Sequence, residues 1–580
     1  MHTNKKVILY LFLFFLLLFS VFQYGITKIV GFSLFPDEFG YWASAANALG
    51  WDWSETASLG SYYSYGYSVL LIPLLILFKN SVAAYRAAIV VNMLLMILAY
   101  FLLLKIKHSI QMGQSKQKDM LLCMTAIFYP SWIFYMQMTM TEALLMFLFV
   151  LLVFLYTSIL EKSNIIRNIL LALVLAYLYM VHMRTIGVVI ACVVVMIILA
   201  IVKPEYRKST LAFLGVLLFF GIMGEIIKSN TIQNVYSHAD RSLVSVNDYS
   251  SKWWIFKELL TLEGIRDLLI SLLGKVFYLG MASFGVFFWA FYWTVKKTCQ
   301  LFHKIFRNNR TENQEWLGFF LLLAMLGEVF ICAIGMYRPG YADGLIYGRY
   351  SEFLMPVYMI IGMKQLEESG KLFLKTGIMA VVTGGCIPVL LWVINSNNLT
   401  VMRGYHAVGI SYLLDEAQNN MTEYLFKAWL FAAIMMFVIS IVIFLSKNIR
   451  NMEWILCCIV LIELGLGMHA TNHYVYPSNI LNYTDIVITD TICENLNENE
   501  SVLYIYSRKN PLIDFIQMQL REHSLHITSR ENTNLLNQIM EADYLIVDNG
   551  IESDIEYESY FEKQISSDRY TLYYDTKEEY

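Results

Sequence analysis

The chain has 580 residues, of which 58% are hydrophobic and only 15% are charged. This composition excludes a set of soluble domains, whose surfaces need more charged side chains. The net charge of −4 is close to balance and gives no reason to expect a nucleic-acid partner.

Long apolar runs recur from residue 7 to about residue 468. A helix needs about 20 apolar residues to cross a bilayer, and runs of this length satisfy their backbone groups in lipid as helices. The first run, 7–21, follows Lys5 and Lys6 and precedes no small-residue cleavage site, so we expect it to be retained as a membrane span. The sequence therefore predicts a polytopic α-helical membrane protein.

Lysine and arginine gather in short loops, and their bias toward the cytoplasm orients the chain with its N-terminus inside. These loops alternate correctly only if the apolar stretch Tyr65–Phe78 does not cross the membrane. This stretch is short, contains Pro73 and follows several tyrosines, which favours the membrane interface. We therefore expect residues 25–81 to form one long outer loop with interfacial helices. The predicted inner loops are 105–119, 161–167, 203–208, 296–310, 364–371 and 447–450.

This topology gives about thirteen transmembrane helices, and an odd number places the C-terminus outside. Residues 1–468 then form the transmembrane domain, and residues 469–580 form a soluble extracytoplasmic domain. The predicted spans are 7–24, 82–104, 120–137, 142–160, 168–182, 186–202, 209–227, 274–295, 316–336, 350–364, 372–395, 426–446 and 453–468.

The extracytoplasmic domain alternates strand-like and helix-like segments, which is typical of a small α/β fold. It carries no catalytic motif, and Ser507-Arg508 and Asp548-Asn549 are typical of turns after strands. The predicted strands are 501–506, 525–528, 544–547 and 570–574, and the predicted helices are 511–523, 532–540 and 557–565.

The long outer loop carries an adjacent acidic pair, Asp37-Glu38, between Pro36 and a possible amphipathic helix at 39–49. Such a pair can accept a proton from an attacking hydroxyl, or it can hold a hard divalent cation. It can equally cap a helix, because carboxylates are favoured at the positive end of the helix dipole. The residues alone leave these interpretations open.

Several other charged residues reach the same face of the membrane under this topology. Glu142 can cap a helix and Arg184 can bind lipid headgroups, so each has a structural explanation of its own. Arginines at span ends on the outer side are nevertheless unusual, and a phosphate-bearing ligand would explain them together. The residues in question are Arg86, Glu142, Arg184, Arg338, Asp343, Arg349 and Tyr350.

The order of these features resembles the GT-C glycosyltransferases, in the branch of the protein O-mannosyltransferases and the lipid A aminoarabinose transferase. Asp37-Glu38 is followed by Tyr41, an alanine-rich stretch and the tyrosine-rich segment YSYGYSVLLIPLLILF. The other matching features are Arg86 near the start of the second span, Thr141-Glu142 between the third and fourth spans, and His182-Met183-Arg184 between the fifth and sixth.

The resemblance implies a GT-C-like fold and a cell-envelope transferase for a hexosyl or pentosyl group. The donor would be a polyprenyl-phosphate-linked sugar, and the extracytoplasmic acceptor would be a lipid, a glycan or a protein. By this resemblance Asp37 is the general base or the acid that orients the acceptor, with Glu38 beside it as support or metal ligand. The same resemblance implies that Glu142 is a supporting acid and that Arg86, Arg184, Arg349 and Tyr350 hold the donor phosphate.

The sequence requires no certain cofactor, although the acidic pair leaves a divalent metal open. The eight cysteines show neither metal-type spacing nor a disulfide framework. Two other functions compete with the transferase: a transporter or polymerase of lipid-linked saccharide, and a non-enzymatic scaffold. A transporter places charges along a path through the membrane and often repeats its halves. The gathering of charges at the outer face and the lack of an internal repeat favour the transferase.

Overall fold

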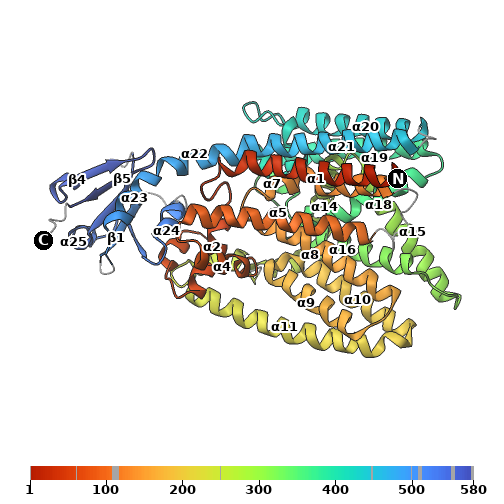
Figure 1. The fold of residues 1–580 in the computed structure, drawn as a ribbon, viewed down its shortest axis with the longest axis horizontal. Coiled ribbons are helices and arrows are strands. Elements are labelled where there is room, and N and C mark those ends of the chain that lie inside the picture. Colours follow the sequence, from red (N-terminus) through yellow and green to blue (C-terminus); the bar gives the residue numbers. More distant parts are fainter. Residues whose placement is uncertain are drawn as a thin grey trace.

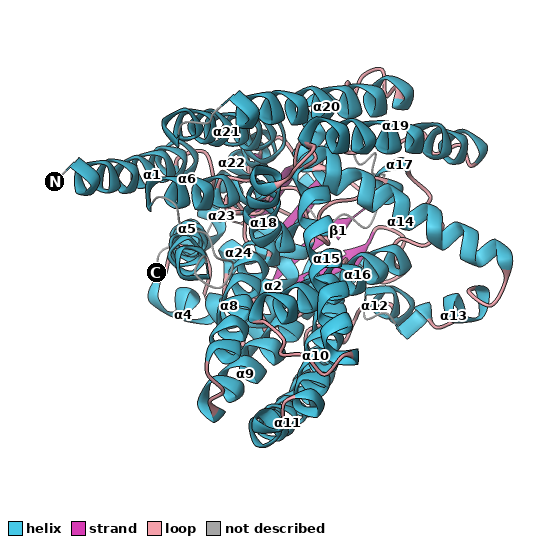
Figure 2. Cartoon of the chain, turned by 90° about the vertical axis from the view of Figure 1, so that its right-hand side faces the viewer, coloured by secondary structure: helices cyan, strands magenta, loops and turns pink. Residues whose placement is uncertain are grey.

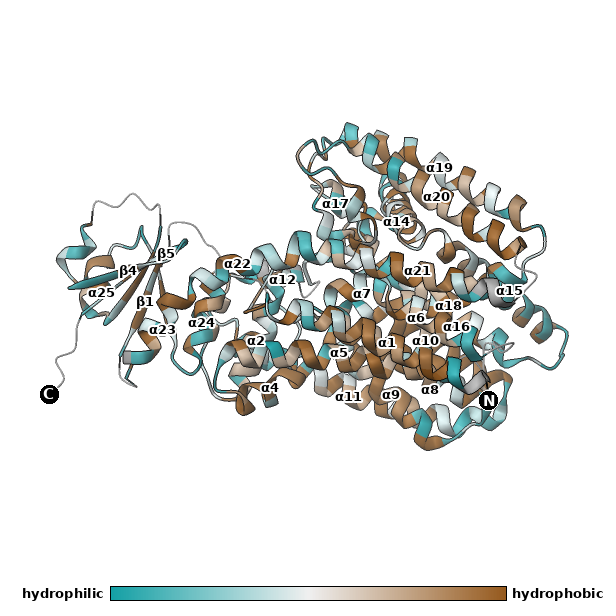
Figure 3. Ribbon diagram, turned by 45° about the horizontal axis from the view of Figure 1, so that its top comes forward, coloured by the Kyte–Doolittle hydropathy of each residue, from teal (hydrophilic) through white to brown (hydrophobic). Residues whose placement is uncertain are grey.

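A bundle of long helices and a small β-sheet at one end of it make up the molecule (Figure 1). The computed structural model describes residues 2–60, 62–106, 116–247, 250–445, 449–497, 500–506, 513–549 and 555–575. Hydrophobic residues dominate the middle of the bundle, whereas hydrophilic residues gather at its ends and in the sheet (Figure 3). This is the distribution that a bilayer requires of a helical protein that crosses it.

Within the described residues, nine helical stretches are long and apolar enough to cross a membrane, or ten if one bent pair counts as a span. The predicted multi-pass membrane protein is thereby confirmed, while the number of thirteen crossings stays a prediction. The bundle helices are α1 (His2–Ile26), α5 (Ser81–Ile106), α8 (Thr141–Glu161), α9 (Ile165–Val181), α10 (Ile186–Val202), α11 (Arg207–Asn234), α14 (Leu262–Ala282), α15 (Val286–Phe306), α16 (Asn313–Gly335), α18 (Met355–Glu368), α19 (Leu372–Ser396), α20 (Met421–Leu445) and α21 (Ile449–Ala470).

Two predicted spans are broken. The run 274–295 contains parts of two helices, α14 and α15, and the chain bends by 115° between them. The break falls at Gly285, whose φ of +78° is a left-handed conformation that glycine adopts at little cost. The run 120–137 divides into α6 (Lys116–Ile127) and α7 (Pro130–Tyr135), where a proline opens the second helix.

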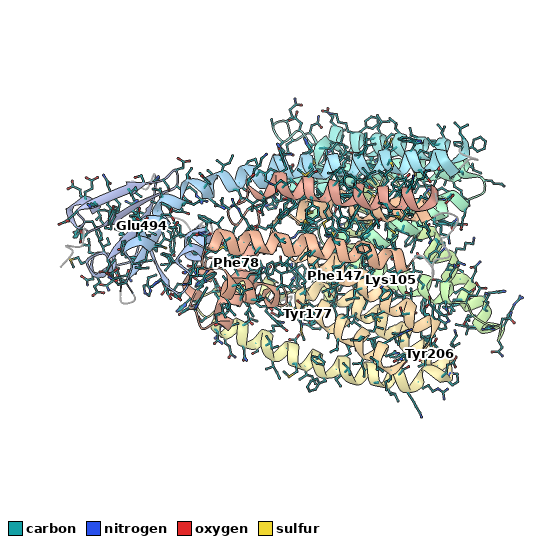
Figure 4. All side chains as sticks on the ribbon, in the orientation of Figure 1. Phe78, Lys105, Phe147, Tyr177, Tyr206 and Glu494 are labelled. Carbon is teal, nitrogen blue, oxygen red and sulfur yellow. The ribbon has the colours of Figure 1, made fainter. Side chains whose placement is uncertain are left out.

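Viewed from its end, the bundle has α9, α10 and α11 along one side and α19 with α20 along the opposite side (Figure 2). The N-terminus and two residues of the predicted inner loops, Lys105 and Tyr206, lie away from the sheet, whereas Phe78 lies at the sheet end (Figure 4). The two ends of the chain thus lie at opposite ends of the bundle, and the side of the membrane that each faces stays a prediction. Residues 107–115 of one predicted inner loop, and 447–448 of another, lie outside the described residues.

The long outer loop contains three short helices, α2 (Asp37–Ala48), α3 (Ser54–Ala57) and α4 (Ser68–Leu77). At about 1.5 Å per residue, α4 is only about 15 Å long, too short to cross the hydrocarbon core. It packs against α2 and α5 at the sheet end of the bundle. The apolar stretch around Pro73 therefore forms a helix too short to cross the membrane, and its position at the interface stays a prediction.

The sheet has five strands in the order β2-β1-β3-β5-β4, with β1, β2 and β3 parallel and β4 and β5 antiparallel additions. The predicted helix 557–565 is wrong: a single turn at Tyr557–Ser559 precedes β4, which pairs with β5 as a hairpin. The elements are β1 (Val502–Tyr506), α24 (Asp514–Leu520), β2 (Leu525–Ser529), α25 (Leu535–Glu541), β3 (Tyr544–Asp548), β4 (Lys563–Ser566) and β5 (Tyr570–Tyr574).

The helix α21 does not stop near residue 468. It continues through a wider turn at Thr471–Val475 into α22 (Tyr476–Thr484) and then α23 (Ile486–Asn495), and the sheet begins seven residues later at Val502. Helical structure thus crosses the predicted domain boundary, and the division at 468 stays a prediction. Ser507-Arg508 and Pro511 lie outside the described residues.

The sheet domain binds the long outer loop through a set of hydrogen bonds that we call the loop–sheet contact. Arg521 donates to Leu75 O at 2.8 Å and to Phe78 O at 2.9 Å, and its own carbonyl accepts from Trp53 Nε1 at 2.5 Å. Glu55 accepts from the backbone N of Ile527 at 2.7 Å. The C-terminal part of the chain therefore holds the loop that carries the acidic pair.

Candidate functional site

Asp37 is the first residue of α2, and Pro36 directly before it fixes the approach of the chain. The helix has no side-chain cap, so capping does not explain this carboxylate. Asp37 Oδ2 instead accepts a hydrogen bond from Arg349 Nη2. The position still suits an acid, since the helix dipole stabilises negative charge in the first turn.

Arg349 extends this pair into a chain of four alternating charges, which we call the charge network. Its Nε donates to Glu142 Oε1 at 2.8 Å, and Arg184 Nη2 donates to the same oxygen at 2.9 Å. The side chains of Arg184, Glu142 and Arg349 are 0%, 1% and 5% exposed, whereas Asp37 is 17% exposed. Two acids thus balance two bases, which makes their burial tolerable, and Asp37 is the most accessible member.

Helix ends bring these residues together. Glu142 lies in the first turn of α8, and Arg184 lies in the turn Met183–Thr185 between α9 and α10. Two rings orient the arginines: the Arg184 guanidinium lies 4.5 Å from the Tyr350 ring centre, and that of Arg349 lies 4.4 Å from the Phe35 ring centre. Both guanidinium groups are therefore held in place before any ligand arrives.

Two cavities meet at this network. One, of about 480 Å³, we call the cation-rich cavity; the other, of about 350 Å³, we call the tyrosine-rich cavity. Asp37, Arg349 and Lys252 line both cavities. The cation-rich cavity is also lined by Phe35, Arg338, Asp343, Tyr347, Arg403 and His406, and the tyrosine-rich cavity by Tyr41, Tyr62, Tyr63, Ser64, His182 and Tyr350.

Lys252 is a site residue that sequence reasoning missed. It ends a short turn, Ser250–Lys252, in an outer loop with no periodic pattern or motif. Its Nζ lies 3.4 Å from Gly335 O, and no carboxylate of the described chain forms a salt bridge with it. Because Arg349 is already balanced by two carboxylates, Lys252 is the cation best placed to bind an anionic ligand at the junction of the cavities.

Glu38 lines neither cavity. It is 0% exposed and accepts hydrogen bonds from Tyr85 OH, from Ser33 N and Oγ at 2.9 and 2.7 Å, and from Thr139 N and Oγ1, both at 2.8 Å. All of its acceptor capacity goes to folding the outer loop against the bundle. The two adjacent acids therefore do not form one ligand pair, and the described part of the chain contains no group of three His, Cys, Asp or Glu residues arranged for a metal ion.

Arg86 is not part of the charge network either. Its Nε donates to Ile29 O at 2.8 Å, which ties α5 to the start of the outer loop. Of the residues predicted from sequence, the structure thus brings together Asp37, Glu142, Arg184 and Arg349, with Tyr350 beside them. It places Arg86 and Glu38 in supporting positions in the fold.

A second polar group lines the cation-rich cavity. Asp343, in the short helix α17 (Ala342–Leu345), is 2% exposed and accepts hydrogen bonds from Arg403 Nε and from His406, whose Nδ1 lies 3.1 Å away. Burial would raise the pKa of Asp343, but the hydrogen bonds from His406 and Arg403 outweigh it and hold that pKa below its usual range. Asp343 is therefore an ionised, buried acid. Arg403 and His406 come from a loop in which the sequence shows no motif.

An apolar groove of about 900 Å³ runs between α10, α14, α15 and α16. Its walls include Gly187, three residues after Arg184, and Ile334, directly before the cavity residue Gly335. Gly187 also lets α10 approach α16, because a Cβ there would lie 2.4 Å from the Gly327 backbone. The groove thus leads along the membrane-facing helices to the level of the charge network.

Comparison with known proteins supports the fold. No protein-family model matches the chain, and no curated protein matches it by sequence. The structure of ArnT from Cupriavidus metallidurans bound to undecaprenyl phosphate is similar, with a TM-score of 0.52 at 10% identity over 97% of both chains. In the apo state ArnT gives a TM-score of 0.50 at 9% identity, covering 99% of this chain and 98% of that one.

The oligosaccharyltransferase AglB from Archaeoglobus fulgidus is also similar, at 10% identity over 92% of this chain and 69% of that one, but its TM-score of 0.41 is too low to indicate a shared fold. ArnT is the lipid A aminoarabinose transferase, a GT-C glycosyltransferase. The predicted resemblance of the fold to GT-C enzymes is therefore confirmed.

Proposed function

We propose that the protein is a membrane glycosyltransferase that moves a sugar from a polyprenyl-phosphate donor to an acceptor on the extracytoplasmic face. The observation that carries this proposal is the position of Asp37, Arg349 and Lys252 at the junction of two cavities. A transferase needs such a junction, because donor and acceptor must meet with a cation beside the leaving phosphate and an acid beside the acceptor. The transferred group would be a hexose or a pentose.

The donor fits the tyrosine-rich cavity and the apolar groove. Hydroxyl-bearing rings such as Tyr41 and Tyr350 suit a sugar, and Lys252 and Arg349 suit its phosphate. The groove, which reaches Gly187 and Ile334 beside these residues, suits a polyprenyl chain. A shared fold with ArnT, whose structure contains undecaprenyl phosphate, supports a donor of this class.

The reaction then follows from the arrangement. An acceptor hydroxyl in the cation-rich cavity attacks the anomeric carbon and gives up its proton to a base, the bond from that carbon to the phosphate oxygen breaks, and the phosphate leaves with the electron pair. Lys252 and Arg349 stabilise the charge that develops on the phosphate. Asp37 orients the acceptor O–H, and Glu142 and Arg184 keep Arg349 in position.

The outer position of the site also favours a transferase over a transporter. The cavities lie beside the outer loop at the sheet end of the bundle, and the charge network runs among helix ends at that level. A transporter would instead need a site near the middle of the membrane with access from both sides. In the proposed orientation the N-terminus is cytoplasmic and the sheet domain is extracytoplasmic.

The test uses full-length protein in nanodiscs with a panel of undecaprenyl-phosphate sugars and an envelope extract as acceptor source. Asp37→Asn should lower sugar transfer by at least about 100-fold, because it removes the charge that orients the acceptor. Protein level, membrane insertion and undecaprenyl-phosphate binding should stay normal. Asp52→Asn is the matched control, since Asp52 lies in the same loop, accepts a hydrogen bond from Ser54 N at 3.0 Å and lines neither cavity. Full transfer by the Asp37 variant would refute the proposed role of this residue.

A further inference from the structure

His406 has one ring nitrogen fixed by a buried acid. Its Nδ1 lies 3.1 Å from Asp343 Oδ2, and Asp343 is 2% exposed. The carboxylate of Asp343 is ionised and can only accept a hydrogen bond, so the proton of a neutral imidazole resides on Nδ1. The other ring nitrogen, Nε2, then carries a lone pair that can accept a proton.

The lone pair is available in the cation-rich cavity. His406 lines that cavity together with Asp37, and within the part of the chain that the structure describes Nε2 makes no hydrogen bond. The imidazole stacks on Phe35, with ring centres 5.9 Å apart and planes 20° apart. The guanidinium of Arg349 lies over the same Phe35 ring, so this ring places the histidine next to the charge network.

We propose that His406, oriented by Asp343, is the general base that takes the proton from the acceptor. This inference rests on the proposed function. The acceptor O–H proton passes to Nε2 while the oxygen bonds to the anomeric carbon and the bond to the phosphate oxygen breaks. The proton later leaves the imidazolium for solvent through the cavity. Asp37 keeps its role of orienting the acceptor. Because His406 lines only the cation-rich cavity, the acceptor binds in that cavity.

The charges around His406 suit this role at neutral pH. Asp343 from α17, Arg403 from its own turn and Arg349 act on the imidazole directly, and Asp37, Lys252 and Arg338 line the same cavity. Burial lowers the pKa of His406 below its usual value, against the opposing effect of the hydrogen bond to Asp343. The imidazole is therefore neutral at pH 7 and able to accept a proton. Activity should fall as the pH drops through this pKa, because protonation fills Nε2.

The experiment compares rate and pH profile, using the undecaprenyl-phosphate sugar that the wild type accepts in the panel above. His406→Asn keeps a donor near the Nδ1 position but lacks the basic nitrogen, and Asp343→Asn favours the wrong tautomer. At each pH between 5 and 8, both variants should transfer sugar about 10²- to 10⁴-fold more slowly than the wild type. The rate of His406→Asn should no longer fall toward acidic pH, whereas that of the wild type should. Undecaprenyl-phosphate binding, measured by native mass spectrometry, should not change. His303→Asn, at an exposed position on α15, is the control.

A third variant separates catalysis from structure. In His406→Ala, added imidazole should restore part of the rate, and more of it at higher pH. Wild-type rate or an unchanged acidic limb in His406→Asn would overturn the inference, as would the absence of imidazole rescue. An inactive Asp37→Asn beside an active His406→Asn would leave the proposed function standing and remove only the base assignment. No turnover by the wild type with any donor would overturn both.

Discussion

A single oxygen atom joins the two buried arginines of the site. Glu142 Oε1 accepts hydrogen bonds from Arg184 at 2.9 Å and from Arg349 at 2.8 Å, and Arg349 also donates a hydrogen bond to Asp37. The acid is 1% exposed, so solvent does not share in balancing the guanidinium charges. Removing one member of such a buried network costs far more than the network contributes as a whole, because the partner charge remains buried.

Glu142→Gln should therefore destabilise the protein by about 3–5 kcal/mol, since two buried arginines would share one carboxylate. The midpoint of thermal unfolding of the purified protein measures this effect. Glu142→Gln combined with Arg184→Gln removes one charge of each sign and should recover much of the loss. Glu205→Gln, at an exposed position, should leave the midpoint unchanged. Simple addition of the two single effects in the double variant would contradict a shared network.

At this scale the sequence predicts some residues well and others not at all. Glu142, Arg184 and Arg349 stand at predicted span ends and Asp37 lies in the long outer loop, and charge topology alone indicates that the four share a face. Lys252 and His406 come from outer loops without periodicity, so no sequence pattern brings them to the site. Direction is also hidden from sequence: Glu38 adjoins Asp37 but turns into the fold to bind Ser33, Tyr85 and Thr139.

The elements show a similar limit. Apolar runs predict the positions of the bundle helices because a bilayer dictates their length. The bend between α14 and α15 is invisible in the run 274–295, since Phe284 and Gly285 do not interrupt its apolar character. The end of the segment wrongly predicted as a helix, 557–565, belongs to the strand β4, because tertiary pairing with β5 decides the structure of a short mixed segment.

The contact between α3 and β2 should respond to pH. His526 Nδ1 lies 3.0 Å from Glu55 Oε1, and this hydrogen bond raises the pKa of His526. Burial alone would raise the pKa of Glu55, but the hydrogen bonds from His526 and Ile527 outweigh burial and lower it. The contribution of His526 to the stability of this contact is present below about pH 6.5 and is lost as the pH rises through the raised pKa of His526. The contribution of Glu55 is lost as the pH falls through the lowered pKa of Glu55. The ion pair therefore stabilises the contact most between about pH 4.5 and 6.5.

Hydrogen–deuterium exchange, corrected for the intrinsic pH dependence, should show residues 52–58 better protected at pH 6 than at pH 8.5. The effect should correspond to less than about 1 kcal/mol, because both side chains are partly exposed. His526→Gln should abolish the difference, whereas His523→Gln, three residues away, should retain it. Equal protection of the wild type at both pH values would contradict this ion pair.

The whole molecule has two native reporters of its orientation. Cys299, on α15 within the predicted inner loop 296–310, and Cys493, on α23 beside the sheet, are both exposed. Charge bias places the first inside the cell and the second outside. A variant that keeps only Cys493 should react with a membrane-impermeant maleimide in intact cells. One that keeps only Cys299 should react only after permeabilisation, and the opposite pattern would invert the proposed topology.

The loop–sheet contact also has a consequence for how the protein is made. The backbone N–H groups of Val30 and Gly31 donate to Asn479, and Trp53 and Glu55 bond to residues 521 and 527. The loop that carries Asp37 leaves the ribosome hundreds of residues before the segment that holds it. A nascent chain therefore inserts its membrane helices first and completes its site last, so a chain cut short by premature termination would enter the membrane without being able to act there.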